Sequence, residues 1–145
     1  FVMAGSGDKM AEMIDLVAKR GIADKFHFPG FMRGKQVQEM LAMSDVYIMP
    51  SVSEPFGISP LEAMQVGCPS IISHQSGCAE ILQHAIKTDY WDIDAMADAI
   101  YAIVKYPAMY KSLHELGMAE VNNIKWSDAG LKVRRIYDGV INHTL

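Results

Sequence analysis

Short apolar strands alternate with amphipathic helices along most of this chain, and this alternation restricts its fold more than any other feature. The expected strands cover residues 1–4, 26–28, 46–49 and 70–73; glycine or proline closes the first three, and Pro69 leads into the fourth. Helical spacing of apolar residues fills the gaps, over residues 9–20, in a helix that carries Val37, Met40 and Leu41, and over residues 59–66. The pattern predicts an α/β fold, a Rossmann-like parallel sheet with helices on both faces.

The second half of the chain continues with weaker strands and longer helices. Residues 79–82 fit a short helix, and residues 86–91 fit an edge strand. Asp92, Pro107 and Ser127 each mark the beginning of an expected helix, with Asp92 and Ser127 as caps. The last helix has one apolar stripe formed by Val133, Ile136, Tyr137, Val140 and Ile141. We expect one domain over residues 1–145.

Composition narrows the class of protein. With 13 basic and 17 acidic residues the net charge is −4, which argues against broad nucleic-acid binding. No apolar run approaches the ~20 residues that span a bilayer, and no leader segment is recognisable. Two cysteines are too few for a disulfide framework, and no spacing indicates a metal site. We therefore expect reduced thiols and a cytoplasmic location.

Ligands of open parallel sheets bind beyond the carboxyl ends of the strands, where the loops converge. The first such loop carries Gly5 and Gly7, but Met10 stands where a dinucleotide fingerprint needs a third glycine. A nicotinamide or flavin cofactor is therefore not expected. The remaining loops at this edge cover residues 29–33, 51–57 and 74–80.

The loop after the third strand carries the strongest chemical signal. Glu54 and Glu62 lie eight positions apart across a glycine turn and a helix start. The amides of Gly57 and Ile58 can face phosphate oxygens, and each carboxylate can accept two hydrogen bonds from a vicinal diol. Two alternatives stay open: Glu62 also fits a capping box with Ser59, and Glu54 could simply be exposed to solvent.

These residues belong to a longer pattern that resembles the signature of the family 4 (group 1) retaining glycosyltransferases. The resemblance covers nearly the whole chain and matches the carboxy-terminal, donor-binding half of a two-domain GT-B enzyme, truncated at its N-terminus. Its most specific part is the glutamate-x7-glutamate run. The matching segments are Pro50-Ser51, Ser53-Glu54-Pro55-Phe56-Gly57, Leu61-Glu62-Ala63-Met64 and Gly67-Cys68-Pro69.

The resemblance implies a role for each matching residue. Glu54 is the implied catalytic residue and contacts hydroxyls of the transferred sugar, while Glu62 holds the ribose of the donor. The resemblance also assigns to the donor site the amides of Phe56, Gly57 and Ile58, the base-side residues Phe31 and Met32, and Gly5 in the first loop. The implied activity is transfer of a sugar from a nucleotide donor with retained anomeric configuration, without a metal, in glycan or polysaccharide biosynthesis.

The family's first strand and helix of this half, with an arginine and a lysine for the diphosphate, should precede Phe1, as should the acceptor domain. We therefore expect this piece alone to be inactive. The acceptor, which is a glycan, a lipid or a small molecule, is expected to bind the missing half. Any peripheral contact with a membrane is expected to involve that half as well. In the family's sheet the missing strand is central. Its absence leaves two open edges that either pair directly or are covered by another chain, so the truncated sheet is open to self-association.

Departures from the family pattern lie in the loop before Glu80, where Ser76-Gly77-Cys78-Ala79 replaces two glycines and an apolar-proline pair. Serine has less conformational freedom than glycine, so a direct contact between this backbone and the donor sugar is less expected there.

Two other functions remain open. A nucleotide-sugar epimerase of the same architecture would form its product without an acceptor, and a non-enzymatic flavodoxin-like module would need an acidic pocket after the first strand.

Overall fold

The computed structural model describes residues 1–142, and the chain divides into two compact units. The first unit covers Phe1–Met40 and the second covers Leu41–Leu145. The boundary falls inside a helix, α2 (Lys35–Ala42). Each unit has its own parallel sheet, and the two are described separately below.

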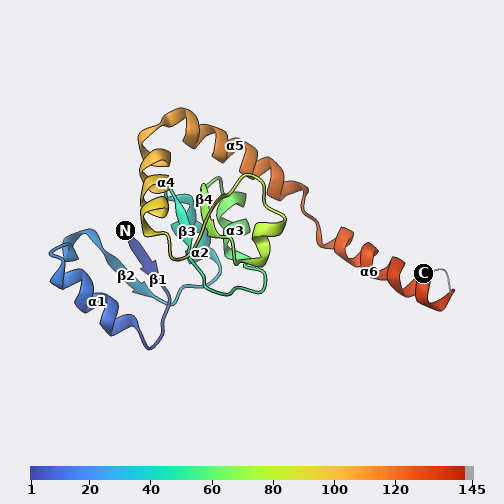
Figure 1. Cartoon of the computed structure of the whole chain (residues 1–145), viewed down its shortest axis with the longest axis horizontal. Helices are drawn as coiled ribbons and strands as arrows, with labels where there is room; N and C mark the ends of the chain where they lie inside the picture. Colours follow the sequence, from blue (N-terminus) through green and yellow to red (C-terminus); the bar gives the residue numbers. More distant parts are fainter. Residues whose placement is uncertain (143–145) are drawn as a thin grey trace. The chain divides into compact units, whose positions relative to one another are not determined.

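The first unit contains two parallel strands and one full helix. β1 (Val2–Ala4) pairs with β2 (His27–Gly30), and α1 (Met10–Lys19) and a 3-10 turn (Ala23–Lys25) connect them (Figure 1). The aromatic rings of Phe1 and Phe26 stack at 5.1 Å beside the strand pair. Both predicted strands and the predicted helix are confirmed.

The second unit has a three-stranded parallel sheet in the order β3-β4-β5. The strands are β3 (Tyr47–Met49), β4 (Ser70–Ser73) and β5 (Ile86–Thr88), so the predicted edge strand is confirmed. α3 (Ser59–Gln65) packs against β3 and β4, whereas α4 (Ile93–Lys105) packs against β4 and β5. The short helix expected at residues 79–82 is instead a 3-10 turn, η2 (Gly77–Glu80).

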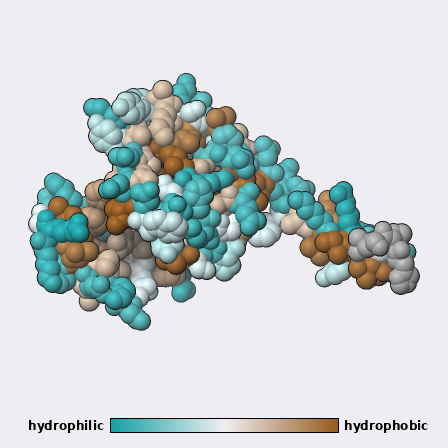
Figure 2. Space-filling model, viewed as in Figure 1, coloured by the Kyte–Doolittle hydropathy of each residue, from teal (hydrophilic) through white to brown (hydrophobic). Residues whose placement is uncertain are grey.

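Two long helices follow, α5 (Pro107–Asn123) and α6 (Trp126–Ile141). Asp92 caps α4 as expected, because its carboxylate accepts the Ala95 N–H at 2.9 Å. The expected Ser127 cap is wrong: α6 begins at Trp126 behind Lys125, and no side chain caps it. The apolar stripe of α6 stays exposed, and Figure 2 shows apolar residues at the surface of this helix.

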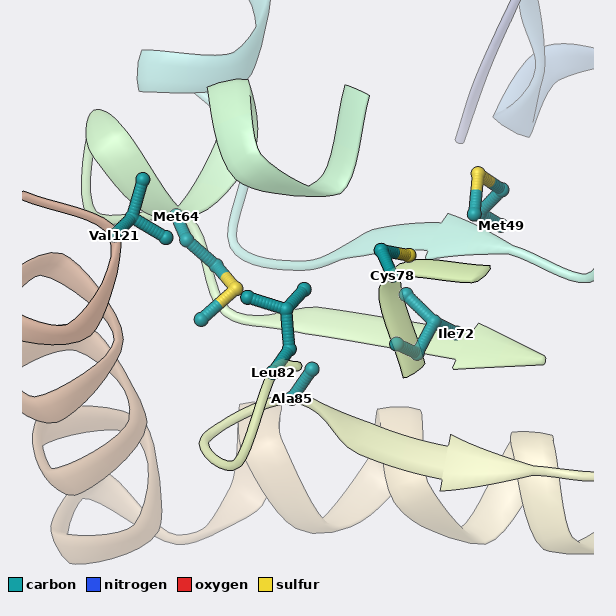
Figure 3. Packing of buried hydrophobic residues seen from close by; sticks show 7 residues of the cluster. All are labelled: Met49, Met64, Ile72, Cys78, Leu82, Ala85 and Val121. Carbon is teal, nitrogen blue, oxygen red and sulfur yellow. The ribbon is translucent and has the colours of Figure 1, made fainter. Parts of the chain in front are cut away.

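The core of the second unit lies between the sheet, α3 and α5. Figure 3 shows its main cluster, whose members come from β3, α3, β4, the segment after β4 and α5. Its residues are Met49, Met64, Ile72, Cys78, Leu82, Ala85 and Val121. Because Met49 and Cys78 belong to this cluster and also adjoin the loops at the carboxyl edge, the core fixes the bases of those loops.

Glu120 of α5 holds the segment between η2 and β5 against the helix. Its carboxylate accepts the backbone N–H of Gln83 at 2.7 Å and that of His84 at 2.9 Å, and it lies 3.1 Å from the His84 ring nitrogen Nδ1. Burial raises the pKa of Glu120, but these hydrogen bonds and the His84 ring outweigh burial and leave its pKa below the usual value.

We expect Glu120→Gln to lower the free energy of unfolding at pH 7 by about 1–2 kcal/mol, because it weakens two hydrogen bonds to a charged acceptor. A carboxylate with a depressed pKa stabilises the fold above its unfolded pKa, and this stabilisation is lost as the pH falls through the folded pKa. The difference between wild type and variant should therefore shrink as the pH falls below 4.5, the ordinary pKa of the group. Urea unfolding at several pH values measures it.

A suitable control lies on the same helix. Glu115 forms an exposed ion pair with Lys111 at 3.8 Å, so Glu115→Gln should change stability by at most a few tenths of a kcal/mol at any of these pH values. A Glu120→Gln variant with wild-type stability at pH 7 would contradict the role of this carboxylate.

Candidate functional site

Two loops at the carboxyl edge of the second sheet are joined by backbone hydrogen bonds. The loop after β3 and the loop after β4 run parallel where Glu54 and Ser76 form an isolated bridge. The Gly77 N–H donates to the Glu54 carbonyl at 2.9 Å, and the Cys78 N–H donates to the Phe56 carbonyl at 2.7 Å. The backbone on both sides of Glu54 is therefore held in place by the neighbouring loop.

Gly77 makes this junction possible. A Cβ atom at Gly77 would overlap the carbonyl oxygen of Pro55 and would lie only 3.1 Å from the Cα of Phe56. Both obstacles are backbone atoms, which cannot turn aside as a flexible side chain can. Only glycine lets the two loops come this close.

Gly57 forms the turn between the two glutamates. Its φ of 87° lies in the left-handed region that side chains rarely adopt. A Cβ there would also lie 2.8 Å from Met49 Cε and 3.1 Å from Glu54 Cγ. The Cys78 thiol borders the same space, and burial raises its pKa, so it is protonated at neutral pH.

The carboxylate of Glu54 is half-buried and folds back onto the following turn. Its Oε1 accepts the backbone N–H of Phe56 at 3.4 Å, a long hydrogen bond. The Phe56 amide thus faces Glu54 in this conformation. No residue within 1–142 accepts the backbone N–H of Gly57 or Ile58; Gly57 is buried and Ile58 is exposed.

Glu62 does not cap its helix, so the capping-box alternative is wrong. The N-cap of α3 is Ile58, whose carbonyl accepts the N–H groups of Leu61 and Glu62 at 2.9 and 3.0 Å. Ser59 is consequently the first helical residue, one position too late for a capping box. The Glu62 side chain is exposed, and α3 has only seven residues, so its dipole contributes little field.

Tyr47 of β3 is half-buried beside the core, and several charges act on its phenol. Burial raises the pKa of its phenol, and it is raised further by the charge that Cys78 gains when it ionises and by the charges of Glu62 and Glu54. A hydrogen bond to the Ser59 side chain opposes these effects. The pKa of this phenol therefore lies above its ordinary value, with burial as the main cause.

A second polar network lies beyond β4 and β5. The Ser73 hydroxyl donates to Gln75 Oε1 at 2.6 Å, and Gln75 Nε2 donates to Asp89 Oδ1 at 3.4 Å. Sequence reasoning missed this network, and it also missed Tyr47. The available signal was position in the sheet, because Ser73 and Gln75 lie at the carboxyl end of β4, Asp89 lies at that of β5, and Tyr47 lies on the neighbouring strand β3.

Ser76 is buried, with 2% of its surface exposed, and its hydroxyl has no hydrogen-bond partner among residues 1–142. Its φ and ψ of −86° and 136° are ordinary for serine. The departure from glycine at this position therefore imposes no backbone strain. It leaves an unpaired hydroxyl instead, which costs stability.

The other predicted donor residues belong to the first unit. Gly5 donates its N–H to the Gly30 carbonyl at 2.7 Å, at the carboxyl end of β1. Phe31 is 63% exposed in the loop after β2, and the Arg33 guanidinium lies 5.0 Å from the centre of its ring. Met32 between them is half-buried. Their part in donor binding stays a prediction.

Two features are absent from residues 1–142. No group of three or more His, Cys, Asp or Glu side chains is placed to hold a metal ion there. Within the same residues, none of the helices combines the length and the apolarity needed to cross a bilayer.

Comparison with known proteins identifies the family. A model of the family "Glycosyl transferases group 1" matches residues 1–118. The chain is 30% identical over 124 residues to 2-deoxystreptamine N-acetyl-D-glucosaminyltransferase of Niallia circulans, covering 83% of this chain and 32% of that protein. It therefore spans about a third of the length of this relative.

Solved structures give the same result for the fold. Sucrose-phosphate synthase of Thermosynechococcus elongatus superposes with a TM-score of 0.80 at 25% identity, over 98% of this chain and 38% of that one. HepE of Anabaena, solved with UDP and glucose, superposes with a TM-score of 0.83 at 17% identity, over 95% and 40%. The α/β architecture is that of the GT-B enzymes, as expected, and the chain belongs to the group 1 glycosyl transferase family.

Proposed function

We propose that this chain binds a nucleoside diphosphate sugar and supplies the donor site of a retaining glycosyltransferase. One observation carries the proposal: Glu54, held by the junction with Gly77, and Glu62 flank a glycine turn whose Gly57 and Ile58 amides have no acceptor within residues 1–142. Two acids and two free donors suit a ligand with two polyol ends and an anionic centre.

Each group has a distinct role in this proposal. The Glu54 carboxylate accepts hydrogen bonds from hydroxyls of the transferred sugar, and Glu62 accepts those of the ribose diol. The N–H groups of Gly57 and Ile58 donate to diphosphate oxygens. The Phe56 amide joins them only if the sugar hydroxyls displace it from the long 3.4 Å bond to Glu54.

The transfer breaks the bond between the sugar C1 and the diphosphate oxygen, and it forms a bond from C1 to an acceptor hydroxyl on the same face. The acceptor's proton passes to an oxygen of the departing diphosphate. Positive charge develops on the sugar ring in such transition states, and the negative charge of Glu54 beside the ring would stabilise it. In this proposal the amides and protein charges replace a metal ion.

The relatives support a sugar donor of this kind. The names of two matched proteins describe an N-acetylglucosaminyltransferase and a complex with UDP and glucose. The acceptor is a glycan, a lipid or a small molecule, and its site belongs to the rest of the enzyme. A cytoplasmic location is part of the proposal, since both cysteines are free.

Calorimetry on the complete polypeptide tests this function. We expect one of the two nucleotides, UDP or GDP, to bind together with its hexose conjugates, and the other nucleotide and its conjugates not to bind. Glu62→Ala should weaken the free nucleotide and its sugar conjugate alike, by about 10- to 100-fold, because the ribose is common to both and charge-assisted hydrogen bonds contribute about 1.5–3 kcal/mol.

Gln65→Ala on the same exposed helix is the matched control, and it should leave both affinities unchanged. Unchanged affinity in the Glu62→Ala variant would overturn the ribose role. Binding of no nucleotide by the wild type would overturn the proposed function as a whole.

A further inference from the structure

Ser76 follows β4 and carries the only buried side-chain nitrogen or oxygen without a hydrogen-bond partner among residues 1–142. Two other buried serines differ from it. The Ser73 hydroxyl donates to Gln75 Oε1 at 2.6 Å, and the Ser70 hydroxyl donates to the Pro60 carbonyl at 3.4 Å. A buried hydroxyl without a partner lowers stability, and most buried polar groups in folded proteins are paired. The Ser76 hydroxyl is therefore open to a partner that this conformation does not supply.

The backbone places this hydroxyl beside Glu54. Glu54 and Ser76 are the paired residues of an isolated parallel bridge, and the Gly77 N–H donates to the Glu54 carbonyl at 2.9 Å. Paired residues of neighbouring extended segments project their side chains to the same face, and such segments lie about 4.8 Å apart. Ser76 has the extended backbone angles that this pairing requires. Its hydroxyl and the Glu54 carboxylate therefore lie on the same side of the junction between the two loops.

The Glu54 carboxylate is only weakly held in this conformation. Its Oε1 accepts the Phe56 N–H at 3.4 Å, and no other group among residues 1–142 donates to it. The usual length of such a bond is about 2.7–3.2 Å. In the proposed function the sugar hydroxyls draw the carboxylate away from this amide, so the half-buried carboxylate loses its protein donor. Rotation of its own side chain brings it to the Ser76 hydroxyl on the same face, without movement of the backbone.

We infer that Ser76 is a positioning residue for Glu54: when the donor is bound, the Ser76 hydroxyl donates to the Glu54 carboxylate after this carboxylate has left the Phe56 amide. This inference rests on the proposed function. The contact would give the hydroxyl its acceptor and would hold the carboxylate against the transferred sugar. Glycine, which the family pattern has at this position, cannot make the contact, so it distinguishes this chain.

Ser76→Ala in the complete polypeptide is the direct test, because it removes one oxygen atom at a position with ordinary backbone angles. We expect the affinity for the nucleotide sugar to fall about tenfold, the lower end for one hydrogen bond to a charged acceptor. The affinity for the free nucleotide should stay unchanged, because without the sugar Glu54 remains on the Phe56 amide. Calorimetry measures both affinities, and Ser76→Gly should reproduce the loss.

Ser70→Ala is the matched control, since Ser70 is equally buried but lies at the other end of β4. Its hydroxyl has acceptors at 3.4 Å, the carbonyl oxygens of Pro60 and Cys68. Ser70→Ala should therefore lower the urea midpoint and leave the ratio of the two affinities unchanged. Ser76→Ala should leave the midpoint unchanged or raise it, and should change the ratio. A general loosening of the fold cannot produce this pair of results.

A double-mutant cycle with Glu54→Ala separates positioning from direct contact with the sugar. If Ser76 acts through Glu54, Ser76→Ala should have no further effect on the affinity for the nucleotide sugar once Glu54 is alanine. An equal loss in both backgrounds would show a contact between Ser76 and the sugar itself and would overturn the inference. Wild-type affinities in the Ser76→Ala variant, as expected of a hydroxyl that only bonds solvent, would overturn it too.

Failure of this inference differs from failure of the proposed function. If Glu62→Ala weakens donor binding and Ser76→Ala does not, the role of Ser76 alone is overturned. Absence of donor binding in the wild type would overturn both.

Discussion

Replacing Glu54 with glutamine should reduce sugar transfer by about 10²- to 10³-fold while leaving the affinity for the free nucleotide nearly unchanged. The carboxylate is expected to hold the sugar and to face the positive charge of the transition state, and the loss of one such electrostatic group costs about 3–4 kcal/mol. Glutamine keeps an oxygen that can accept the Phe56 N–H, so the turn should stay in place.

Transfer to water measures this effect without knowledge of the acceptor. Release of nucleoside diphosphate from the donor gives the turnover, and calorimetry gives the affinities for nucleotide and nucleotide sugar. Ser53→Ala, an exposed neighbour in the same loop, should behave as the wild type does in all three measurements. Activity of the Glu54→Gln variant should also be as insensitive to EDTA as that of the wild type.

Two results would count against the catalytic role of Glu54. One is wild-type turnover in the glutamine variant. The other is equal loss of affinity for nucleotide and nucleotide sugar, which would indicate that the whole turn had been displaced.

The strands and helices could be predicted because each is a local pattern. An apolar run that ends before Pro50 predicts β3. The alternation of strands and helices around this run predicts that Glu54 lies in a loop at the carboxyl edge of the sheet. Even the edge strand at Ile86–Thr88, with only three residues, follows a turn and an apolar start. In such segments neighbouring residues alone determine the backbone.

The predicted capping box is wrong because it requires the helix to begin at one particular residue. α3 begins at Ser59 instead of after it, and this moves Glu62 from the third helical position to the fourth. The Ile58 carbonyl accepts the N–H groups of Leu61 and Glu62 and so begins the helix one residue earlier than the capping box requires. The sequence therefore located the two acids but not the first residue of the helix that carries Glu62.

Gly77 shows the same limit more sharply. In the sequence Gly77 is one member of an imperfect glycine pair, and its neighbour Ser76 is the residue that departs from the family pattern. In the structure Ser76 has ordinary backbone angles, whereas Gly77 lies where two backbones from different loops touch. The constraint is a contact between residues 22 positions apart, Gly77 and Pro55, so only the structure reveals it.

Gly77→Ala should therefore have the largest effect on stability of the substitutions considered. The added methyl group meets the backbone of Pro55 and Phe56, and relief requires that the two loops separate. Separation breaks the hydrogen bonds from Gly77 to Glu54 and from Cys78 to Phe56. We expect the free energy of unfolding to fall by about 3 kcal/mol, at the upper end for overpacking, and donor binding to be lost because Glu54 moves with its loop.

Two further alanine variants separate this cause from a general effect of alanine. Gly130→Ala makes the same substitution inside α6, where a Cβ meets nothing within 4 Å, and it should stabilise the chain by about 0.5–1 kcal/mol. Ser76→Ala, next to Gly77, removes a buried hydroxyl without a partner within residues 1–142 and should be neutral or stabilising. Urea unfolding of all three variants decides the matter: if Gly77→Ala matches Gly130→Ala, the two loops can separate at no cost, and Glu54 does not depend on their contact.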